Sequence, residues 1–250
     1  MIEAADITKA FNGRTVMHGI SATFEDGKTN LIIGKSGSGK TVLLKSLVGL
    51  YDVDSGSILY DGRDTTRMGR KERLRLRQEI GMIFQGSALF DYMTVLENVR
   101  FPLDMFSTLS ARDRDRRAKE CLRRVNMEEA ADGLFPAQIS GGMQKRVAIA
   151  RAIVQGPRYL FCDEPNSGLD PVTSGVIDTL IAEITHEAGI TTIINTHDMN
   201  SVFTIGEHIA FIERGRKLWD GDQSTILQSD CPELKQFMQS AVRLMRLAKQ

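Results

Sequence analysis

The stretch that decides the fold of this chain reads Gly34-Lys35-Ser36-Gly37-Ser38-Gly39-Lys40-Thr41. It fits the phosphate-loop pattern, with an apolar strand candidate, Leu31–Ile33, before it and an apolar helix candidate, Val42 to about Leu50, after it. Glycines let successive backbone N–H groups curl around phosphates, and the helix start adds a partial positive charge. Lys40 should reach the β- and γ-phosphates, and the Thr41 hydroxyl should ligate Mg²⁺. The stretch predicts a nucleoside triphosphate site, as against a glycine turn that binds nothing, but kinases, GTPases and motors share it.

Length, charge and cysteine usage narrow the class of protein. The 250 residues suit one large domain, and the 32 basic and 32 acidic residues argue against a protein that mainly grips nucleic acid. Cys121, Cys162 and Cys231 lie far apart, which is typical of reduced packing residues in a reducing compartment. The N-terminus shows no signal-peptide pattern, and no apolar run approaches the roughly 20 residues of a membrane-spanning helix. We therefore expect a soluble chain that reaches a membrane only through a partner.

Short apolar strands alternate with helical patterns, which is typical of a parallel sheet with crossover helices. The expected central strands are Thr29–Ile33, Ile80–Phe84, Tyr159–Cys162 and Thr191–Asn195. An alternating segment, His208–Trp219, predicts an antiparallel hairpin around Arg214-Gly215. The best-signalled helices run from Ser110 to about Met127, from Ser140 to about Val154, and from Asp170 to Gly189. Helical signals between about 87 and 155 predict a mostly helical insertion in an α/β fold.

Two acids, Asp163 and Glu164, follow the strand candidate Tyr159–Cys162. Ligands bind at this end of the strands in such sheets. Asp163 would hold the Mg²⁺ shell, and Glu164 would orient or deprotonate a water that attacks the γ-phosphate. The alternative is a pair of exposed acids that begin a turn at Pro165. The phosphate loop upstream favours the functional interpretation, because a nucleotide-bound metal needs a second acid.

A second anion site is predicted at Ile139-Ser140-Gly141-Gly142-Met143-Gln144. Ser140 can cap the helix that follows, and the free N–H groups at a helix start favour a phosphate. Taken alone, Ser-Gly-Gly is merely a helix start. The segment resembles the Leu-Ser-Gly-Gly-Gln signature of ATP-binding cassette (ABC) proteins, with Ile139 and Met143 in place of the usual Leu and Gln.

The resemblance covers about Ile2 to Phe237 and implies a role for each remaining motif, in the family's order. Phe11 matches the aromatic residue that stacks on adenine, and Gln85 matches the glutamine that contacts Mg²⁺ and the water. Ser167-Gly168-Leu169-Asp170 matches the D-loop. His197 matches the switch histidine at the γ-phosphate; a lone histidine after a strand is more often structural, but its place in the ordered set favours function.

The resemblance implies a RecA-like P-loop NTPase core with an antiparallel β subdomain and an inserted helical subdomain. We expect a single ABC ATPase domain over residues 1–250. Its parts would be the core and antiparallel β parts at about 1–86 and 156–230, the helical subdomain at about 87–155, and a C-terminal helix at about 232–250. Such cassettes work as head-to-tail pairs. Each ATP would lie between one chain's phosphate loop and Ser140, Gly141 and Gly142 of a second copy.

Two features look like the ATPase subunit of Mla-type phospholipid transporters. They are Met143 and the run Gly86–Asp91 that leads into Thr94–Val99. This resemblance implies a transmembrane permease, an MCE-domain lipid-binding subunit and an accessory cytoplasmic subunit as partners, with ATP and Mg²⁺ as ligands and no nucleic acid. It also implies a peripheral position on the cytoplasmic side of a bacterial inner membrane. The alternatives are another transported substrate or a non-transport ABC ATPase that acts on nucleic acid or ribosomes.

Three further segments leave alternatives open. Leu89, Phe90, Tyr92 and Met93 could form a groove for a permease helix or cover the chain's own helical core. The basic stretch Arg70–Arg77 is typical of a solvated helix face, with Leu74 and Leu76 partly buried. The apolar stripe of the C-terminal helix could pack on this chain, a second copy, another subunit or a membrane; its members are Leu234, Phe237, Met238, Ala241, Leu244, Met245 and Ala248.

Overall fold

The computed structural model describes residues 1–247, with side chains through residue 239. Within that part of the chain, the larger sheet has the strand order β10-β9-β3-β8-β7-β6. Its parallel strands are β3 (Thr29–Ile33), β6 (Ile80–Ile83), β7 (Tyr159–Asp163), β8 (Thr191–Thr196) and β9 (His208–Glu213). The hairpin partner β10 (Arg216–Gly221) runs antiparallel to β9. The predicted central strands and hairpin are confirmed, and the hairpin extends the parallel sheet.

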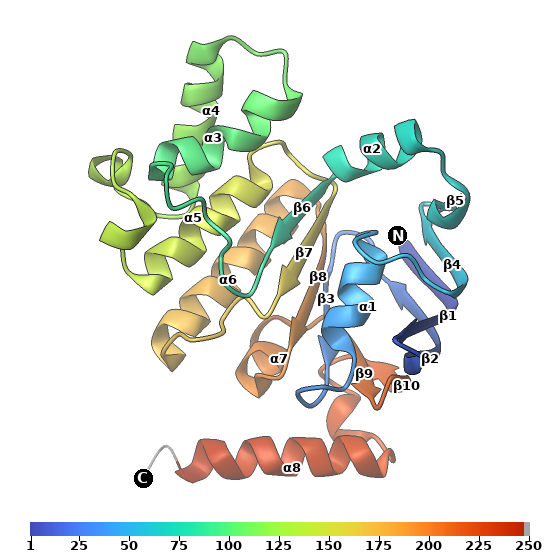
Figure 1. The fold of residues 1–250 in the computed structure, drawn as a ribbon. Helices are drawn as coiled ribbons and strands as arrows, with labels where there is room; N and C mark the ends of the chain where they lie inside the picture. Colours follow the sequence, from blue (N-terminus) through green and yellow to red (C-terminus); the bar gives the residue numbers. More distant parts are fainter. Residues whose placement is uncertain (248–250) are drawn as a thin grey trace.

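A second, wholly antiparallel sheet has the order β2-β1-β4-β5. Its strands are β1 (Ile2–Phe11), β2 (Arg14–Phe24), β4 (Ser55–Tyr60) and β5 (Arg63–Asp64). It lies beside α1 in Figure 1, on the opposite side of the molecule from the helices α3, α4 and α5. None of these four strands was predicted individually from the sequence.

The helices lie in two groups around the larger sheet (Figure 1). Residues 87–155 contain α3, α4 and α5, while α1 and α6 cover the core. Their bounds are α1 (Lys40–Leu47), α2 (Arg70–Gln78), α3 (Val95–Phe106), α4 (Ala111–Arg124), α5 (Gly141–Ile153), α6 (Pro171–Ala188), α7 (Met199–Ile205) and α8 (Pro232–Leu247). None of the described helices has the length and apolar character that crossing a bilayer requires.

Two helices end earlier than the sequence pattern predicts, and both ends have a backbone cause. Helix α4 stops at Arg124, and Asn126 follows with φ of 57°, a left-handed conformation that ends a helix. Helix α1 stops at Leu47, two residues before Gly49 with φ of 76°. The expected end of α6 at Gly189 is confirmed, since Gly189 caps it with φ of 60°.

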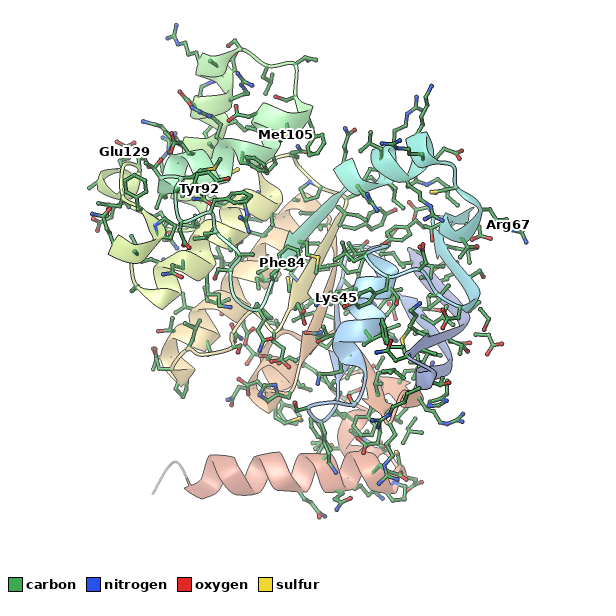
Figure 2. The ribbon with its side chains drawn as sticks, in the orientation of Figure 1. Lys45, Arg67, Phe84, Tyr92, Met105 and Glu129 are labelled. Carbon is green, nitrogen blue, oxygen red and sulfur yellow. The ribbon has the colours of Figure 1, made fainter. Side chains whose placement is uncertain are left out.

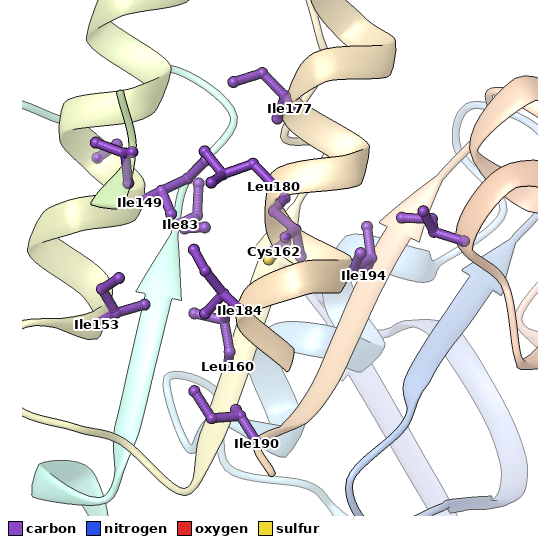
Figure 3. Packing of buried hydrophobic residues seen from close by; sticks show 14 of the residues in the cluster. Ile83, Ile149, Ile153, Leu160, Cys162, Ile177, Leu180, Ile184, Ile190 and Ile194 are labelled. Atoms are coloured by element: carbon purple, nitrogen blue, oxygen red, sulfur yellow. The ribbon is translucent and has the colours of Figure 1, made fainter. Parts of the chain in front are cut away.

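The core that supports the site joins the sheet to α5 and α6. Figure 3 shows Ile83, Leu160, Cys162 and Ile194 on the strands facing apolar side chains of these helices. All four side chains are fully buried. Parallel strands covered by helices need apolar residues on both faces, which explains their unbroken apolar runs. The rigid sheet therefore presents its strand ends as a fixed edge.

The structure decides part of what the sequence left open for the basic stretch Arg70–Arg77 and for the C-terminal helix. In α2, Leu76 is buried as expected, but Leu74 is 49% exposed, so the expectation that Leu74 is partly buried is wrong. In α8, Leu234, Phe237 and Met238 join the core of their own chain, and the Phe237 ring lies 5.6 Å from that of Phe211. The predictions for Ala241, Leu244, Met245 and Ala248 fall outside the described side chains.

Candidate functional site

The predicted phosphate loop connects β3 to α1 and is held open by left-handed glycines. Gly34 has φ of 152°, and a Cβ there would lie 2.1 Å from the carbonyl oxygen of Ile212, so no other residue fits. Gly39 has φ of 109° and stands at the start of α1. The backbone N–H of Gly215 donates to the carbonyl of Ser38 at 2.9 Å, which fixes the loop to the β9–β10 turn. The result is a preformed cradle of backbone N–H groups.

Lys40 lies over this cradle. Its side chain is nearly buried, and its Nζ donates to the carbonyls of Gly34 at 2.9 Å and Lys35 at 3.1 Å. Burial lowers the pKa of Lys40, while the negative charges of Glu164 and Asp163 oppose that change. The ammonium group is thus held by weak neutral acceptors at the place where an anion would bind it more strongly.

Thr41 and Asp163 bring two oxygen atoms together. The Thr41 hydroxyl donates to Oδ1 of Asp163 at 3.1 Å, and Nδ2 of Asn195 donates to the same carboxylate oxygen at 2.7 Å. Asp163 and Asn195 are paired residues at the ends of β7 and β8, so the sheet sets this geometry. Hydroxyl and carboxylate oxygens are ligands that Mg²⁺ prefers, with phosphate and water completing its shell.

Metal-ligating side chains form no cluster of their own among the residues that the structure describes. No group of three or more His, Cys, Asp or Glu side chains in the described residues could hold a metal ion.

Glu164 stands at the centre of the predicted catalytic residues. Its Oε1 lies 3.2 Å from Nδ1 of His197, and its Oε2 accepts from Nε2 of Gln85 at 3.3 Å. The Glu164 side chain is 17% exposed, and its backbone has φ of 46°, a strained conformation for a non-glycine residue. The backbone N–H of Glu164 donates to Oδ1 of Asn195 at 2.7 Å, which supports that conformation. The structure thus brings Glu164, Gln85 and His197 together.

The four D-loop residues Ser167, Gly168, Leu169 and Asp170 lead from Glu164 into α6. Nε2 of Gln85 donates to the Ser167 hydroxyl at 3.2 Å, which links this loop to the same cluster. Asp170 caps α6 by accepting from the N–H groups of Val172 and Thr173, each at 3.0 Å. A pocket lies between the D-loop and the segment after His197; its lining includes Glu164, Ser167, Gly168, Leu169, His197 and Asn200.

The predicted second anion site does not join the phosphate loop within one chain. Ser140 caps α5 by accepting from the N–H of Met143 at 3.2 Å, as predicted. Ser140 and Gly141 are exposed, and Gly142 lies against Thr173 of α6. Helix α5 belongs to the helical part, well separated from α1 in Figure 1. The exposed start of α5 is therefore free to meet another molecule.

Phe11, the predicted adenine-stacking residue, lies at the end of β1. Its ring makes an edge contact with Tyr51, which follows α1, at a centroid distance of 5.2 Å. Nζ of Lys9 lies 5.4 Å from the Phe11 ring centroid. The ring is 36% exposed, so part of it remains open to a stacking partner.

The apolar residues after Gln85 do not all follow the same predicted alternative: one packs on the chain's own core and another lines a groove. Leu89 packs against the chain's own core, whereas Phe90 lines a groove between β6 and α3. Tyr92 is 73% exposed beside Phe90. Figure 2 shows Phe84 at the end of β6 and Met105 in the helical part, on either side of this region. Other residues that line the groove are Phe84, Ala88, Phe101, Pro102 and Phe106.

Sequence reasoning missed three polar residues that shape the site. Asn195 holds both Asp163 and Glu164, Lys145 donates to the carbonyl of Gln85, and Arg151 donates to the carbonyls of Ser87 and Ala88. Asn195 interrupts an apolar run just before His197, which was an available signal. Lys145 and Arg151 look like ordinary positions on an amphipathic helix, and only the fold reveals their partners.

Comparison with known proteins gives a consistent result. The family model described as ABC transporter matches residues 17–167. The chain is 35% identical over 244 residues to the probable ribonucleotide transport ATP-binding protein mkl of Mycobacterium tuberculosis, covering 95% of this chain and 66% of mkl. It is 39% identical over 224 residues to the methionine import ATP-binding protein MetN of Carboxydothermus hydrogenoformans, covering 89% of this chain and 66% of MetN. The chain thus spans 66% of the length of these curated relatives.

Solved structures give the same fold. The dimeric structure of MJ0796, a bacterial ABC transporter cassette, superposes with a TM-score of 0.82 at 32% identity and covers 89% of this chain and 98% of MJ0796. A post-hydrolysis dimer of MJ0796 bound to ADP and Pi superposes with a TM-score of 0.81 at 31% identity. These similarities bear out the predicted ABC ATPase fold.

Proposed function

The chain belongs to the ABC transporter family, and we propose that it is the ATP-hydrolysing subunit that drives a phospholipid transporter. The observation that carries the ATPase assignment is the position of Glu164, held between Gln85 and His197 beside the Thr41–Asp163 pair. The family match and the ADP- and Pi-bound MJ0796 structure support hydrolysis.

The proposed binding site takes MgATP as substrate. The backbone of Gly34, Lys35, Ser36, Gly37, Ser38 and Gly39 binds the phosphates, Lys40 neutralises their charge, and Phe11 stacks on the adenine. Thr41 and Asp163 would hold Mg²⁺, and Gln85 would contact it. The metal, when bound, neutralises charge on the phosphate oxygens.

Glu164 accepts a proton from the attacking water or orients it, and His197 donates a hydrogen bond toward the γ-phosphate. The Glu164 carboxylate contacts both His197 and Gln85. A γ-phosphate and its water would exchange these contacts for contacts with the reacting atoms.

The site is completed by a second copy of this chain. The exposed helix start at Ser140, Gly141 and Gly142 would close over the phosphate loop of the partner, with the D-loop residues 167–170 at the same interface. The separation of the two half-sites within one chain supports this arrangement. The dimeric state of MJ0796 supports it as well.

The proposed transporter partner is a transmembrane permease that contacts the groove lined by Phe84, Phe90 and Phe106. Exposed apolar side chains of this size are costly in water unless a partner covers them. Phe84 and Ala88, which lie on either side of Gln85 in the sequence, both line the groove, so a permease helix seated there would contact the segment that carries a site residue. The chain would thereby act on the cytoplasmic side of a bacterial inner membrane.

Phospholipid as the transported substrate rests on Met143 and on the segments Gly86–Asp91 and Thr94–Val99, which look like Mla-type cassettes. An MCE-domain lipid-binding subunit and an accessory cytoplasmic subunit complete that proposal. The names of mkl and MetN favour ribonucleotide and methionine as the competing substrates. The non-transport alternative would bind nucleic acid or ribosomes instead.

Purification of this chain from detergent-solubilised membranes of its own cell tests the assignment. Co-purification of a permease with an MCE-domain protein and bound phospholipid is the expected result. A permease with a periplasmic amino-acid or nucleotide receptor would replace the lipid proposal, and ribosomes or DNA in place of a permease would overturn the transporter proposal itself.

A further inference from the structure

A hydrogen-bond cluster next to the site joins three segments that are far apart in the sequence. Asp178 of α6 is 2% exposed. Its Oδ1 accepts from Nδ2 of Asn166 at 2.6 Å, and its Oδ2 accepts from the hydroxyl of Ser201 at 2.7 Å. Nδ2 of Asn166 also lies 3.4 Å from the Ser201 hydroxyl oxygen. The three side chains thus form a closed triangle.

The members of this triangle come from the elements that carry the catalytic groups. Asn166 lies two residues after Glu164, at the start of the D-loop segment. Ser201 lies four residues after His197, within α7. Asp178 lies on α6, which packs on the sheet through Ile177, Leu180 and Ile184 (Figure 3). Helix α6 is therefore the fixed base to which both loops are tied.

We propose that Asp178 is a positioning residue for ATP hydrolysis, which holds the Glu164 loop and the His197 loop in fixed relation through Asn166 and Ser201. The inference rests on the proposed function of this site. In front of the triangle, the Glu164–His197 contact of 3.2 Å must break when a γ-phosphate enters. Asp178 is 2% exposed and its carboxylate takes no part in that exchange, so its contacts can persist and keep the two groups aligned.

The chemistry of the triangle requires the ionised carboxylate. An amide N–H and a hydroxyl both donate to Asp178, one to each oxygen, and protonation would convert one of these acceptors into a donor. Burial raises the pKa of Asp178 to about 6, against the two hydrogen bonds that lower it. The charged or titratable neighbours that face it are Asp198 of the α7 cap, which raises its pKa further, and the buried thiol of Cys162 on β7. The clamp is thus complete above about pH 6 and weakens below it.

The test compares variants of the 250-residue chain in MgATP hydrolysis and MgATP binding. Asp178→Ala removes both acceptors, and we expect kcat to fall about 10- to 100-fold while the Kd for MgATP changes less than about twofold. Asp178→Asn keeps the shape but, like the protonated acid, offers one acceptor and one donor, so its kcat at neutral pH should lie between those of Asp178→Ala and the wild type. Its kcat should decline less between about pH 7 and pH 5.5 than that of the wild type, because the titrating group is gone.

Thr185→Val provides the matched control on the same helix. Thr185 is fully buried, and its hydroxyl bonds to Ile181 and Thr192 at the end of α6 remote from Glu164. This variant should lose stability without any change in kcat. If Asp178→Ala lowers kcat no more than Thr185→Val, or if Asp178→Asn keeps the wild-type decline at low pH, Asp178 has no positioning role. A wild-type chain that hydrolyses no ATP, by contrast, would overturn the proposed function.

Discussion

Oε1 of Glu164 lies 3.2 Å from Nδ1 of His197, although the two residues follow different strands, β7 and β8, and stand 33 positions apart. The parallel register of β7 with β8 makes this contact, because both strands end at the same edge. The sheet therefore sets the distance between the two groups. The site is organised in advance, which electrostatic stabilisation of a transition state requires.

Replacing Glu164 by Gln should slow hydrolysis without abolishing binding. The amide keeps the size of the side chain but accepts no proton from water, so we expect kcat to fall by about 100-fold or more. Single-turnover hydrolysis and equilibrium binding of MgATP measure the two effects separately. Glu183→Gln on the exposed face of α6 is the control. Turnover of Glu164→Gln at the wild-type rate would remove Glu164 from its assigned role.

A negative charge at Ser140 should prevent ATP-dependent dimerisation. Asp is as good a helix cap as Ser, so Ser140→Asp preserves α5 while it repels phosphate at the helix start. Size-exclusion chromatography with light scattering, with and without MgATP, reports the change. Ser110→Asp, at the exposed cap of α4, should dimerise like the wild type. Dimerisation of Ser140→Asp at wild-type ATP concentrations would count against the shared site.

A charge in the apolar groove should release the permease. Phe90→Asp places a carboxylate among Phe84, Phe101 and Phe106, which would oppose docking of an apolar helix. Leu89 packs on the core, so it is left intact to avoid unfolding the helical part. Co-purification with membrane proteins should be lost for Phe90→Asp and retained for Leu227→Asp, a change at a 67% exposed residue. Equal recovery of the permease with both variants would contradict the groove assignment.

Asp178→Asn should make the protein more stable at neutral pH even as it disturbs function. The pKa of Asp178 is higher in the folded protein, about 6, than its ordinary value of 3.8. Folding is therefore favoured by this group below about pH 4 and loses that contribution as pH rises through about 6. A neutral amide avoids the cost of burying the charge, so the free energy of unfolding should rise by up to about 3 kcal/mol near pH 8. Urea unfolding of both proteins at several pH values measures it; a stability gain that is the same at pH 4 and pH 8 would contradict the assignment.

The parallel core and the site motifs were predictable because their signals are local. The strand β7 is apolar on both faces from Tyr159 to Cys162, and Asp163 at its end and Glu164 follow without a gap. The resemblance implied an antiparallel β subdomain, but the individual strands of the β2-β1-β4-β5 sheet were not predicted, because β1 lacks regular alternation. Asp6 has φ of 51°, and the pairing with β2 shifts between Ala4 and Ile7, so the two-residue pattern is broken in the middle of the strand.

Buried polar partners were beyond sequence reasoning for a different reason. Asn195 and Asp178 find their partners 31 to 32 and 12 to 23 positions away, respectively, and neither spacing matches a helix or strand period. Their role appears only when the sheet edge and α6 are placed in space. The hydrogen bonds of Asp178 with Asn166 and Ser201 could therefore be recognised only from the fold.

Subunit complementation tests the central claim most directly, because the claim is that two copies share each site. Lys40→Ala disables the phosphate loop, and Ser140→Asp disables the helix start, so each variant alone should be inactive. In a mixed dimer, the intact loop of one chain meets the intact helix start of the other. An equimolar mixture should therefore regain up to about one quarter of the wild-type ATPase rate. A mixture that stays as inactive as its components would contradict the shared site.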